Sequence, residues 1–375
     1  MSIMEFHSSN ALKLRQLYSI LSTTMQSPSK TLIIRFSSVG DIVLTTPLLR
    51  VLRQAFPASQ IDFVTRTEYA ELVRTNHNLN VTWTYDASTG FSGLRSLMRT
   101  LRAERYDLVL DLHNSIRSRY LRLGLGAVQM VAVNKRILRR WLLVNFKKNF
   151  YSGIVSVADR YIETLDRFGI RNDGKGPELH IPDELLFGIS GKVASLRLHR
   201  FEKIIGLCPA ARHATKEWPL DRYAEVAVRF CRERNGGVMI FGGSAEKARA
   251  LELAQQIGIR IGSDRVISWV GELSLMESAA TMEYCDVIVT NDSGLMHVAA
   301  AMNKKIVAIF GSTVREFGFA PVSDAAVILE TEGLSCRPCS PIGRSRCPKN
   351  HFRCMLDVEP ERVVETMSEM MDEKS

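Results

Sequence analysis

Residues 31–53 read TLIIRFSSVGDIVLTTPLLRVLR, and this stretch decides the fold. Its first six residues form an apolar run that only Arg35 interrupts, which is typical of a strand buried on both faces of a parallel sheet. A short polar turn, SSVGD, follows, and apolar residues then recur at helical spacing through residue 56. A buried strand that leads through a turn into an amphipathic helix indicates a βα unit.

The same alternation of strand and helix recurs along two separate stretches of the chain. In the first, further strands are predicted at residues 61–64, 81–86 and 107–112, with helices at 71–76 and 94–104. In the second, strand segments are predicted at 203–210, 237–243, 266–271, 286–294 and 305–311, with helices at 220–235, 245–257, 275–284 and 295–302. Residues 177–186, PELHIPDELL, are predicted to link the two stretches.

We therefore predict an α/β fold of two doubly wound domains that face each other across a cleft. The predicted division is an N-terminal extension at 1–30, a first domain at 31–180, a second domain at 181–355 and a C-terminal helix at 356–375. Ligands of open parallel sheets bind beyond the carboxyl ends of the strands, near helix N-termini. Two facing domains would supply one half-site each, which suits the joining of two substrates.

The composition narrows the class of partner. The chain has 375 residues, 46% of them hydrophobic and 24% charged, a balance typical of folded globular domains. Its net charge of +9 indicates an anionic or phosphate-bearing partner. No run approaches the roughly 18 uninterrupted apolar residues that a membrane span needs, and Lys13 and Arg15 interrupt the apolar stretch near the N-terminus. We expect a cytoplasmic protein and leave peripheral membrane attachment open.

Asp41 closes the turn after the first predicted strand. A carboxylate there lies at the carboxyl edge of the sheet and at the start of a helix, whose dipole favours the ionised form. Such a group can accept a proton from a bound hydroxyl. The alternative is that Asp41 only caps the helix, since Asp is common at N-caps. One glycine in this turn does not make a dinucleotide-binding fingerprint.

A second candidate site follows the strand DVIVT and reads NDSGLMH, residues 291–297. Small polar residues at a helix N-terminus form an anion site because free backbone N–H groups point at the ligand. Ser293 and Gly294 are therefore predicted to hold a diphosphate, with His297 as a further donor. The alternative is a capped helix with a surface histidine. The stretch lacks the lysine of a P-loop, so a nucleoside triphosphatase is not expected.

Two other residues follow strands of the second series. Lys216 lies in the loop ARHATKEWP, where its ammonium could reach the same phosphates, or could be an ordinary solvated charge. Glu246 opens the helix after GGS, where it could bond ribose hydroxyls or simply complement the helix N-terminus.

A basic, apolar-studded stretch precedes the linker. Its densest part carries six cations interleaved with Ile, Leu and Trp: Lys135, Arg136, Arg139, Arg140, Lys147 and Lys148. Such a stretch suits an anionic lipid surface or a phosphorylated glycolipid. An amphipathic helix with a solvated face is the other interpretation.

Four of the seven cysteines lie close together near the C-terminus, at Cys336, Cys339, Cys347 and Cys354. Four thiols within nineteen residues can hold a structural zinc. Two disulfides, or four reduced thiols without a ligand, are the alternatives. We assign no catalytic thiol, because His351 is the one nearby histidine and pairs poorly as a base.

Taken in order, these motifs resemble the lipopolysaccharide heptosyltransferases of glycosyltransferase family 9. The resemblance rests on IIRFSSVGDIVLTTPLLRVLR, DLVLDLHNSIRSRYLRLGLGA, ARHATKEWP, TNDSGLMHVAAAM, IFGSTVREFGFAP and the C-terminal CRPC…RCP…RCM. It implies a GT-B fold of two Rossmann-like domains. It also implies inverting transfer of heptose from ADP-heptose to a lipopolysaccharide inner-core acceptor, with no metal in catalysis.

The resemblance also implies roles for individual residues. Asp41 is the expected catalytic base, and the expected donor-binding residues are Lys216, Glu246, Asp292, Ser293, Gly294 and His297. The expected acceptor-binding residues are Ser38, Gly40, Arg117 and Arg119. The expected partners are ADP-heptose, an anionic glycolipid and the cytoplasmic surface of the inner membrane, and no nucleic acid.

Two other functions share this fold. A nucleotide-sugar epimerase or hydrolase would act without an acceptor, and a nucleotide-binding envelope protein would not catalyse at all. The transferase interpretation requires the carboxylate of Asp41 to face the opening between the domains and not to lie in a buried salt bridge.

Overall fold

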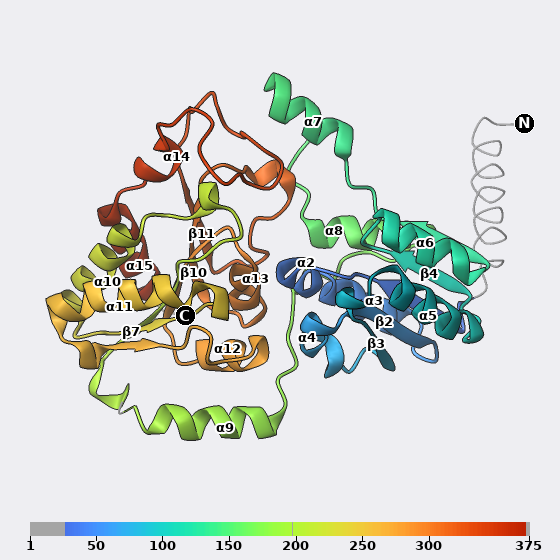
Figure 1. Ribbon diagram of the computed structural model, residues 1–375, viewed down its shortest axis with the longest axis horizontal. Helices are drawn as coiled ribbons and strands as arrows, with labels where there is room; N and C mark the ends of the chain where they lie inside the picture. Colours follow the sequence, from blue (N-terminus) through green and yellow to red (C-terminus); the bar gives the residue numbers. More distant parts are fainter. Residues whose placement is uncertain (1–26, 197, 373–375) are drawn as a thin grey trace, which may run out of the picture.

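The computed structural model describes residues 27–196 and 198–372. Most of the predicted N-terminal extension, with Lys13 and Arg15, lies outside these residues. Lys30, the last residue of that extension, already belongs to the first strand. Figure 1 shows two lobes side by side, each built around its own sheet.

The first sheet has five parallel strands in the order β3-β2-β1-β4-β5. Their bounds are β1 Lys30–Ile34, β2 Gln60–Arg66, β3 Val81–Tyr85, β4 Leu108–Asp111 and β5 Gln129–Ala132. In central β1, Ile33 belongs to the core on one face of the sheet, while Leu32 and Ile34 belong to the core on the other. Burial on both faces explains the unbroken apolar run that predicted this strand.

Helices cover both faces of the first sheet. They are α2 Val39–Val43, α3 Thr46–Ala55, α4 Glu71–Arg74, α5 Gly90–Ala103, α6 Ile116–Leu125 and α8 Val157–Ile162. The helix α7, Ile137–Phe146, follows β5 but stands apart from the sheet (Figure 1). The apolar face of α3, with Leu48, Leu49 and Leu52, is fully buried against this sheet's core. The predicted helix at 94–104 begins earlier than expected, at Gly90.

The second sheet has six parallel strands in the order β11-β10-β9-β6-β7-β8. Their bounds are β6 Ile204–Cys208, β7 Gly237–Ile240, β8 Val266–Ser268, β9 Val287–Asn291, β10 Lys305–Phe310 and β11 Ala326–Glu330. Its helices are α10 Leu220–Arg234, α11 Lys247–Ile261, α12 Leu275–Met282, α13 Gly294–Ala301, α14 Arg353–Leu356 and α15 Pro360–Asp372. Short 3₁₀ helices lie at Thr67–Tyr69, Ala87–Thr89, Glu163–Phe168, Leu198–Arg200, Ala214–Lys216, Ser244–Glu246, Ser263–Arg265 and Arg315–Phe317.

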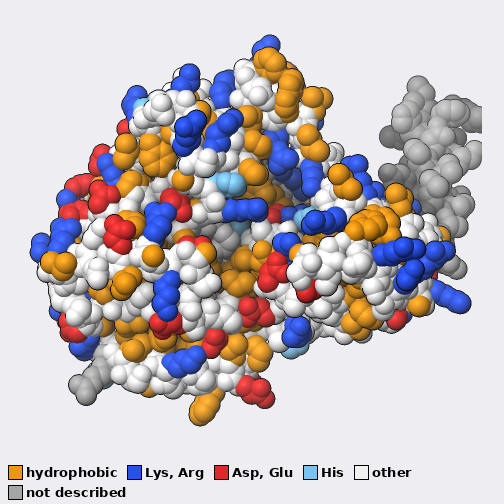
Figure 2. All heavy atoms as spheres, in the orientation of Figure 1, with side chains coloured by type: hydrophobic (Ala, Val, Ile, Leu, Met, Phe, Trp, Pro, Cys, Tyr) orange, Lys and Arg blue, Asp and Glu red, His pale blue; other side chains and the backbone are white. Residues whose placement is uncertain are grey.

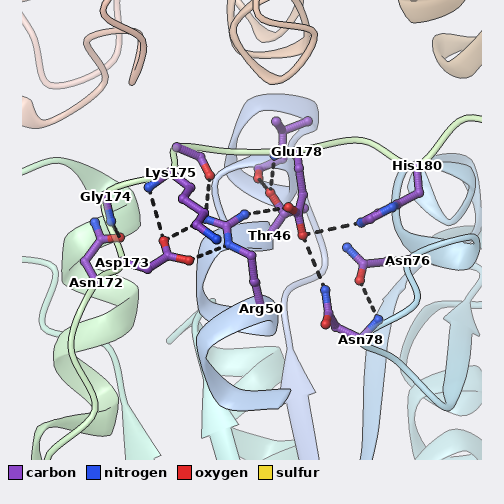
Figure 3. Close-up of polar contacts among 12 residues, drawn as sticks. Thr46, Arg50, Asn76, Asn78, Asn172, Asp173, Gly174, Lys175, Glu178 and His180 are labelled. Carbon is purple, nitrogen blue, oxygen red and sulfur yellow. Dashed lines mark hydrogen bonds and ion pairs between the residues drawn. The ribbon is translucent and has the colours of Figure 1, made fainter. Parts of the chain in front are cut away.

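The connection between the lobes differs from the predicted linker at 177–186. Extended chain reaches only to Pro182, where α9, Asp183–Ala194, begins. Arg50 of α3 holds the connecting segment against the first lobe, because its guanidinium forms ion pairs with the carboxylates of Asp173 and Glu178 at 2.7 and 2.6 Å (Figure 3). The backbone N–H of Glu178 also donates to the hydroxyl of Thr46 at 2.9 Å.

The C-terminal helix α15 packs on the second lobe through Val363 and Met367, which belong to the core that α10 also covers. The predicted fold class, two doubly wound α/β domains across a cleft, is confirmed by the two parallel sheets and the cavity described below. The residue boundaries assigned to the domains stay a prediction. Across the described residues, no helix is both long enough and apolar enough to cross a bilayer.

Candidate active site

A cavity of about 710 Å³ opens between the two lobes. In Figure 2 the surface is hollowed there. The first lobe lines it with Ser38, Gly40 and Asp41. The second lobe lines it with the six predicted donor-binding residues, which are Lys216, Glu246, Asp292, Ser293, Gly294 and His297. Ser38 and His297, which lie 259 positions apart in sequence, therefore meet in one cavity.

Asp41 is the third residue of α2, and Ser38 is the N-cap of that helix. The Ser38 hydroxyl and backbone N–H donate to Asp41 Oδ2 at 2.9 and 3.2 Å. Asp41 is thus part of the cap, although the N-cap position itself belongs to Ser38. Its other oxygen, Oδ1, lies 2.6 Å from Arg35 Nη2 and accepts a hydrogen bond from the Tyr161 hydroxyl at 3.3 Å.

Asp41 was expected to be free of a buried salt bridge, and that expectation is wrong. The carboxylate is paired with Arg35, and its side chain is 16% exposed. The second part of the expectation, that Asp41 faces the interdomain opening, is met because Asp41 lines the cavity. The base candidate is therefore held by a cation and still reachable from the cleft.

The ion pair sets the protonation state of Asp41. Burial alone would raise its pKa, but the charge of Arg35 and the Ser38 hydrogen bonds together bring the pKa below its usual value. Asp41 is therefore ionised at neutral pH. We expected the helix dipole to do this, and the main cause is instead a neighbouring arginine six residues earlier in the chain.

Lys216 and Asp292 form the centre of the opposite wall. Lys216 Nζ lies 2.7 Å from Asp292 Oδ2, and the Thr313 hydroxyl donates to the same oxygen at 2.6 Å. The interpretation of Lys216 as an ordinary solvated charge is therefore wrong. Both donors bind the same carboxylate oxygen of Asp292, and this ion pair orients the ammonium of Lys216 in the cavity wall.

The helix α13 begins at the cavity with Ser293 as its N-cap, and Ser293 makes no side-chain capping bond. The first N–H groups of a helix have no partner within the helix, so this end can receive an anion. Gly294 also touches the first lobe, because a Cβ on it would lie 2.9 Å from Val39 Cβ. A glycine is thus required for α2 and α13 to approach as Figure 1 shows.

His297 is buried, and the alternative of a surface histidine is wrong. It is 3% exposed and packs so closely on α2 that a Cβ on Gly40 would lie 2.4 Å from its ring carbon. Burial lowers its pKa to about 4, although Asp292 and Asp41 act in the opposite direction. At neutral pH the imidazole is uncharged, and its Nδ1 has no hydrogen-bond partner among the described residues. This nitrogen is itself buried, so its hydrogen-bonding capacity is unused among the described residues.

Comparisons with known proteins identify the family of this chain. A sequence model of glycosyltransferase family 9 (heptosyltransferase) matches residues 94–348, more than half of the chain. The chain belongs to glycosyltransferase family 9. It is 27% identical over 360 residues to lipopolysaccharide heptosyltransferase 2 of Escherichia coli K12, covering 91% of this chain and 98% of that protein.

Two solved structures are similar over the same extent. The family 9 glycosyltransferase of Veillonella parvula matches with a TM-score of 0.75 and 25% identity, covering 92% of this chain and 98% of the other. The E. coli ADP-heptose LPS heptosyltransferase II matches with a TM-score of 0.70 and 25% identity, covering 91% and 98%. This family 9 glycosyltransferase therefore has the GT-B fold that the resemblance implied.

In this glycosyltransferase, Glu246 ends a short 3₁₀ helix and is the N-cap of α11. Its carboxylate lines the cavity, and no ion pair or hydrogen bond to it occurs among the described residues. Gly243 leaves room for it, because a Cβ there would lie 3.0 Å from Glu246 Oε2. An unengaged carboxylate next to the anion site suits the hydroxyls of a ribose.

Arg117 and Arg119 are not brought to the cavity. Both are exposed on α6, and Arg119 Nε donates to Asn114 Oδ1 at 3.0 Å. Lys135 lies close enough to this site to feel its charges, because its pKa is lowered by burial and then by Arg35 and Arg140, while Asp111 and Asp41 act in the opposite direction. Sequence reasoning placed Lys135 only in the general basic stretch, because nothing in its spacing distinguished it from its neighbours.

Of the three alternatives for the C-terminal cysteines, the zinc site is not formed. All four C-terminal cysteines carry free thiols, so the disulfide alternative is also wrong. Within residues 27–196 and 198–372, no three His, Cys, Asp or Glu side chains are placed to hold a metal. Cys354 instead packs with Met355 in the apolar core of the second lobe, so it is not available as a ligand beside the other three.

Proposed function

We propose that this glycosyltransferase moves heptose from ADP-heptose to an inner-core lipopolysaccharide acceptor, with inversion and with Asp41 as general base. One observation carries the proposal: an ionised carboxylate and an anion-binding helix N-terminus line the same cavity from opposite lobes. The similarity to the E. coli ADP-heptose LPS heptosyltransferase II supports this choice of donor.

The second lobe binds the donor. The diphosphate lies at the start of α13, where the N–H groups near Ser293 and Gly294 donate to it and Lys216 neutralises it. Glu246 accepts hydrogen bonds from the ribose hydroxyls. His297, which is neutral and lines the cavity, offers one further hydrogen bond to the ligand.

The first lobe activates the acceptor. An acceptor hydroxyl near Ser38 and Gly40 attacks the anomeric carbon from the face opposite the diphosphate, so the configuration inverts in one step. The new C–O bond forms as the bond to the diphosphate breaks, the hydroxyl proton passes to Asp41, and ADP leaves. A general base of this kind typically contributes about 10²–10⁴-fold in rate.

The ion pair with Arg35 makes Asp41 a weak base, and this weak basicity determines at which point of the reaction the acceptor's hydroxyl proton is transferred. A carboxylate of lowered pKa does not deprotonate a free hydroxyl. The hydroxyl becomes strongly acidic only once its oxygen is bonding to the anomeric carbon, so transfer to Asp41 is late. Arg35 and Tyr161 meanwhile hold Oδ1 in place, which leaves the carboxylate oriented toward the cavity.

The negative charge that develops on the leaving diphosphate is met by Lys216 and the helix N-terminus, and we propose that no metal is needed for catalysis. Preorganised donors of this kind are worth about 3–4 kcal/mol each in known enzymes. We also propose that the acceptor is an anionic glycolipid reached at the cytoplasmic surface of the inner membrane, and that nucleic acid is not a partner.

Product analysis tests the function. Purified protein is incubated with ADP-heptose alone and with ADP-heptose plus the lipid acceptor, and ADP release and the anomeric configuration of the product are followed by NMR. The proposal expects acceptor-dependent ADP release and an inverted glycoside. Rapid donor turnover without acceptor would support an epimerase or hydrolase, and binding of ADP without any turnover would support a non-catalytic protein.

A further inference from the structure

The helix α7 and the loop after it carry an unusual group of exposed apolar side chains. Six of them are between 49% and 67% exposed: Ile137, Leu138, Trp141, Phe146, Phe150 and Ile154. Ile137, Leu138 and Trp141 fall within one turn and so share one face of the helix. We call these six residues, together with Arg139 and Lys148, the α7 surface.

The α7 surface projects from the molecule. Figure 1 shows α7 standing apart from both sheets, above the gap between the lobes, and Figure 2 shows apolar and cationic side chains together on that projection. Leu143 is the one residue of α7 that is buried. An apolar patch this exposed on a folded protein marks a contact with something else.

The charge around this surface identifies the kind of contact. From residue 135 to residue 148, α7 and the residues on either side of it contain six Lys and Arg residues and no Asp or Glu. Of these six cations, Arg136 is paired with Glu163. Arg139 and Lys148 are exposed beside the apolar side chains. Apolar side chains interleaved with cations suit a medium that is apolar inside and anionic at its surface.

A second copy of this chain does not meet that requirement. A symmetric dimer through the α7 surface would place the same acid-free segment against itself, and its cations would repel. A soluble phosphorylated headgroup would pair with the cations but leave six apolar side chains in water. We propose that the α7 surface docks on a lipid bilayer rich in anionic lipid.

The docking position bears on the cavity. At the end of α7, Lys147 Nζ donates to the carbonyls of Cys336 and Pro338, at 3.1 and 2.6 Å. The same loop continues into Pro341 and Ile342, which line the cavity. Docking α7 therefore holds the rim of the cavity at the bilayer, where, on the function proposed above, the glycolipid acceptor resides.

Vesicle binding tests the proposal. The full chain is sedimented with vesicles of phosphatidylcholine alone and with vesicles containing phosphatidylglycerol, at low and high salt. We expect binding only to the anionic vesicles, weakened by salt.

Two double variants separate the charged and the apolar contributions to binding. Arg139→Gln with Lys148→Gln should weaken vesicle binding about fivefold for each cation. Ile137→Asn with Leu138→Asn should weaken it about tenfold or more. Ile259→Asn, on helix α11 of the second lobe and 87% exposed, is the control and should bind as wild type.

Tryptophan fluorescence gives an independent readout. Trp141 should shift to shorter wavelength on binding, and Trp141→Phe should remove the shift, which assigns it among the four tryptophans. Equal binding of the Ile137→Asn/Leu138→Asn variant and wild type would overturn the proposal. So would a concentration-dependent dimer that this variant abolishes. Transfer to a deacylated, soluble acceptor without vesicles separates the two proposals, because a docking failure leaves that activity intact while a failure of the proposed function removes it.

Discussion

Arg35 Nη2 and Asp41 Oδ1 lie 2.6 Å apart at the carboxyl end of β1. Arg35 is itself fixed, because its Nη1 donates to the carbonyl of Leu112 at 2.6 Å. The pair keeps a partly buried carboxylate ionised and points it at the opposite lobe. The side chain that interrupts the apolar strand in the sequence is therefore the one that orients the candidate base.

Replacing Arg35 should move the pH dependence of transfer. Without the cation, burial raises the pKa of Asp41, and the acid limb of the kcat profile should shift upward by roughly one to three pH units. The sign follows because only the ionised carboxylate accepts the proton. The measurement is kcat against pH for Arg35→Gln, with Arg35→Lys as the control that restores a cation. An unchanged acid limb in Arg35→Gln would show that Arg35 does not set the pKa of Asp41.

Lys216→Ala should lower kcat about 10²-fold or more, because a donor aimed at the leaving diphosphate is lost. The matched control is Lys192→Ala, which breaks another lysine–carboxylate pair, with Glu277 at 2.8 Å, outside the cavity lining. That variant should retain wild-type kcat. Equal effects of the two substitutions would show that Lys216 acts only through stability.

Gly40→Ala should disturb the approach of the two lobes. The added Cβ would lie 2.4 Å from the ring of His297, which leaves no room for it in the present packing. Overpacking of this kind typically costs about 1–3 kcal/mol of stability. A double-mutant cycle with His297→Ala, read by thermal unfolding, should show that the second change relieves the first. Additive losses would mean that this contact does not limit the packing.

The stability of the protein should fall in mild acid because of His297. Its pKa is about 4 in the folded state and near 6.5 when unfolded, so between these values only the unfolded chain takes up the proton. The free energy of unfolding should therefore decrease as the pH drops from about 6.5 to 4, by an amount on the order of 3 kcal/mol. His297→Gln should flatten this slope in urea titrations across that range. A slope that persists unchanged would assign the effect to other groups, His113 among them.

The sequence predicts the central strands well and the edge strands unevenly. Strand β1 is buried on both faces and reads as a continuous apolar run. The edge strands β3 and β8 were predicted, but β5, which is only partly buried throughout, and β11, in which Leu329 is the one buried residue, were missed. The same limit applies to α9, whose exposed start follows Pro182 and was taken as linker. The apolar pattern of a sequence indicates which segments are buried, so weakly buried elements are harder to predict from it.

The candidate site divides in a similar way. Loops after strands could be predicted to converge, because the carboxyl ends of parallel strands share one edge. The residues that hydrogen-bond to the site carboxylates could not be predicted, because they are distant in sequence. Tyr161 donates to Asp41 from 120 residues away, and Thr313 donates to Asp292 from 21 residues away. The one available signal was Arg35, a charge at the end of a buried apolar run, which demands a partner.

The most direct test of the account is the Asp41→Asn variant, with transfer of heptose to the lipid acceptor and binding of ADP measured on the same preparation. The side chain keeps its size and can still accept from Ser38, but it can no longer take a proton. The account predicts transfer reduced by about 10²–10⁴-fold with ADP affinity unchanged, because the nucleotide binds on the other lobe. Full transfer by this variant would contradict Asp41 as the base, and loss of ADP binding would contradict the division of the site between the lobes.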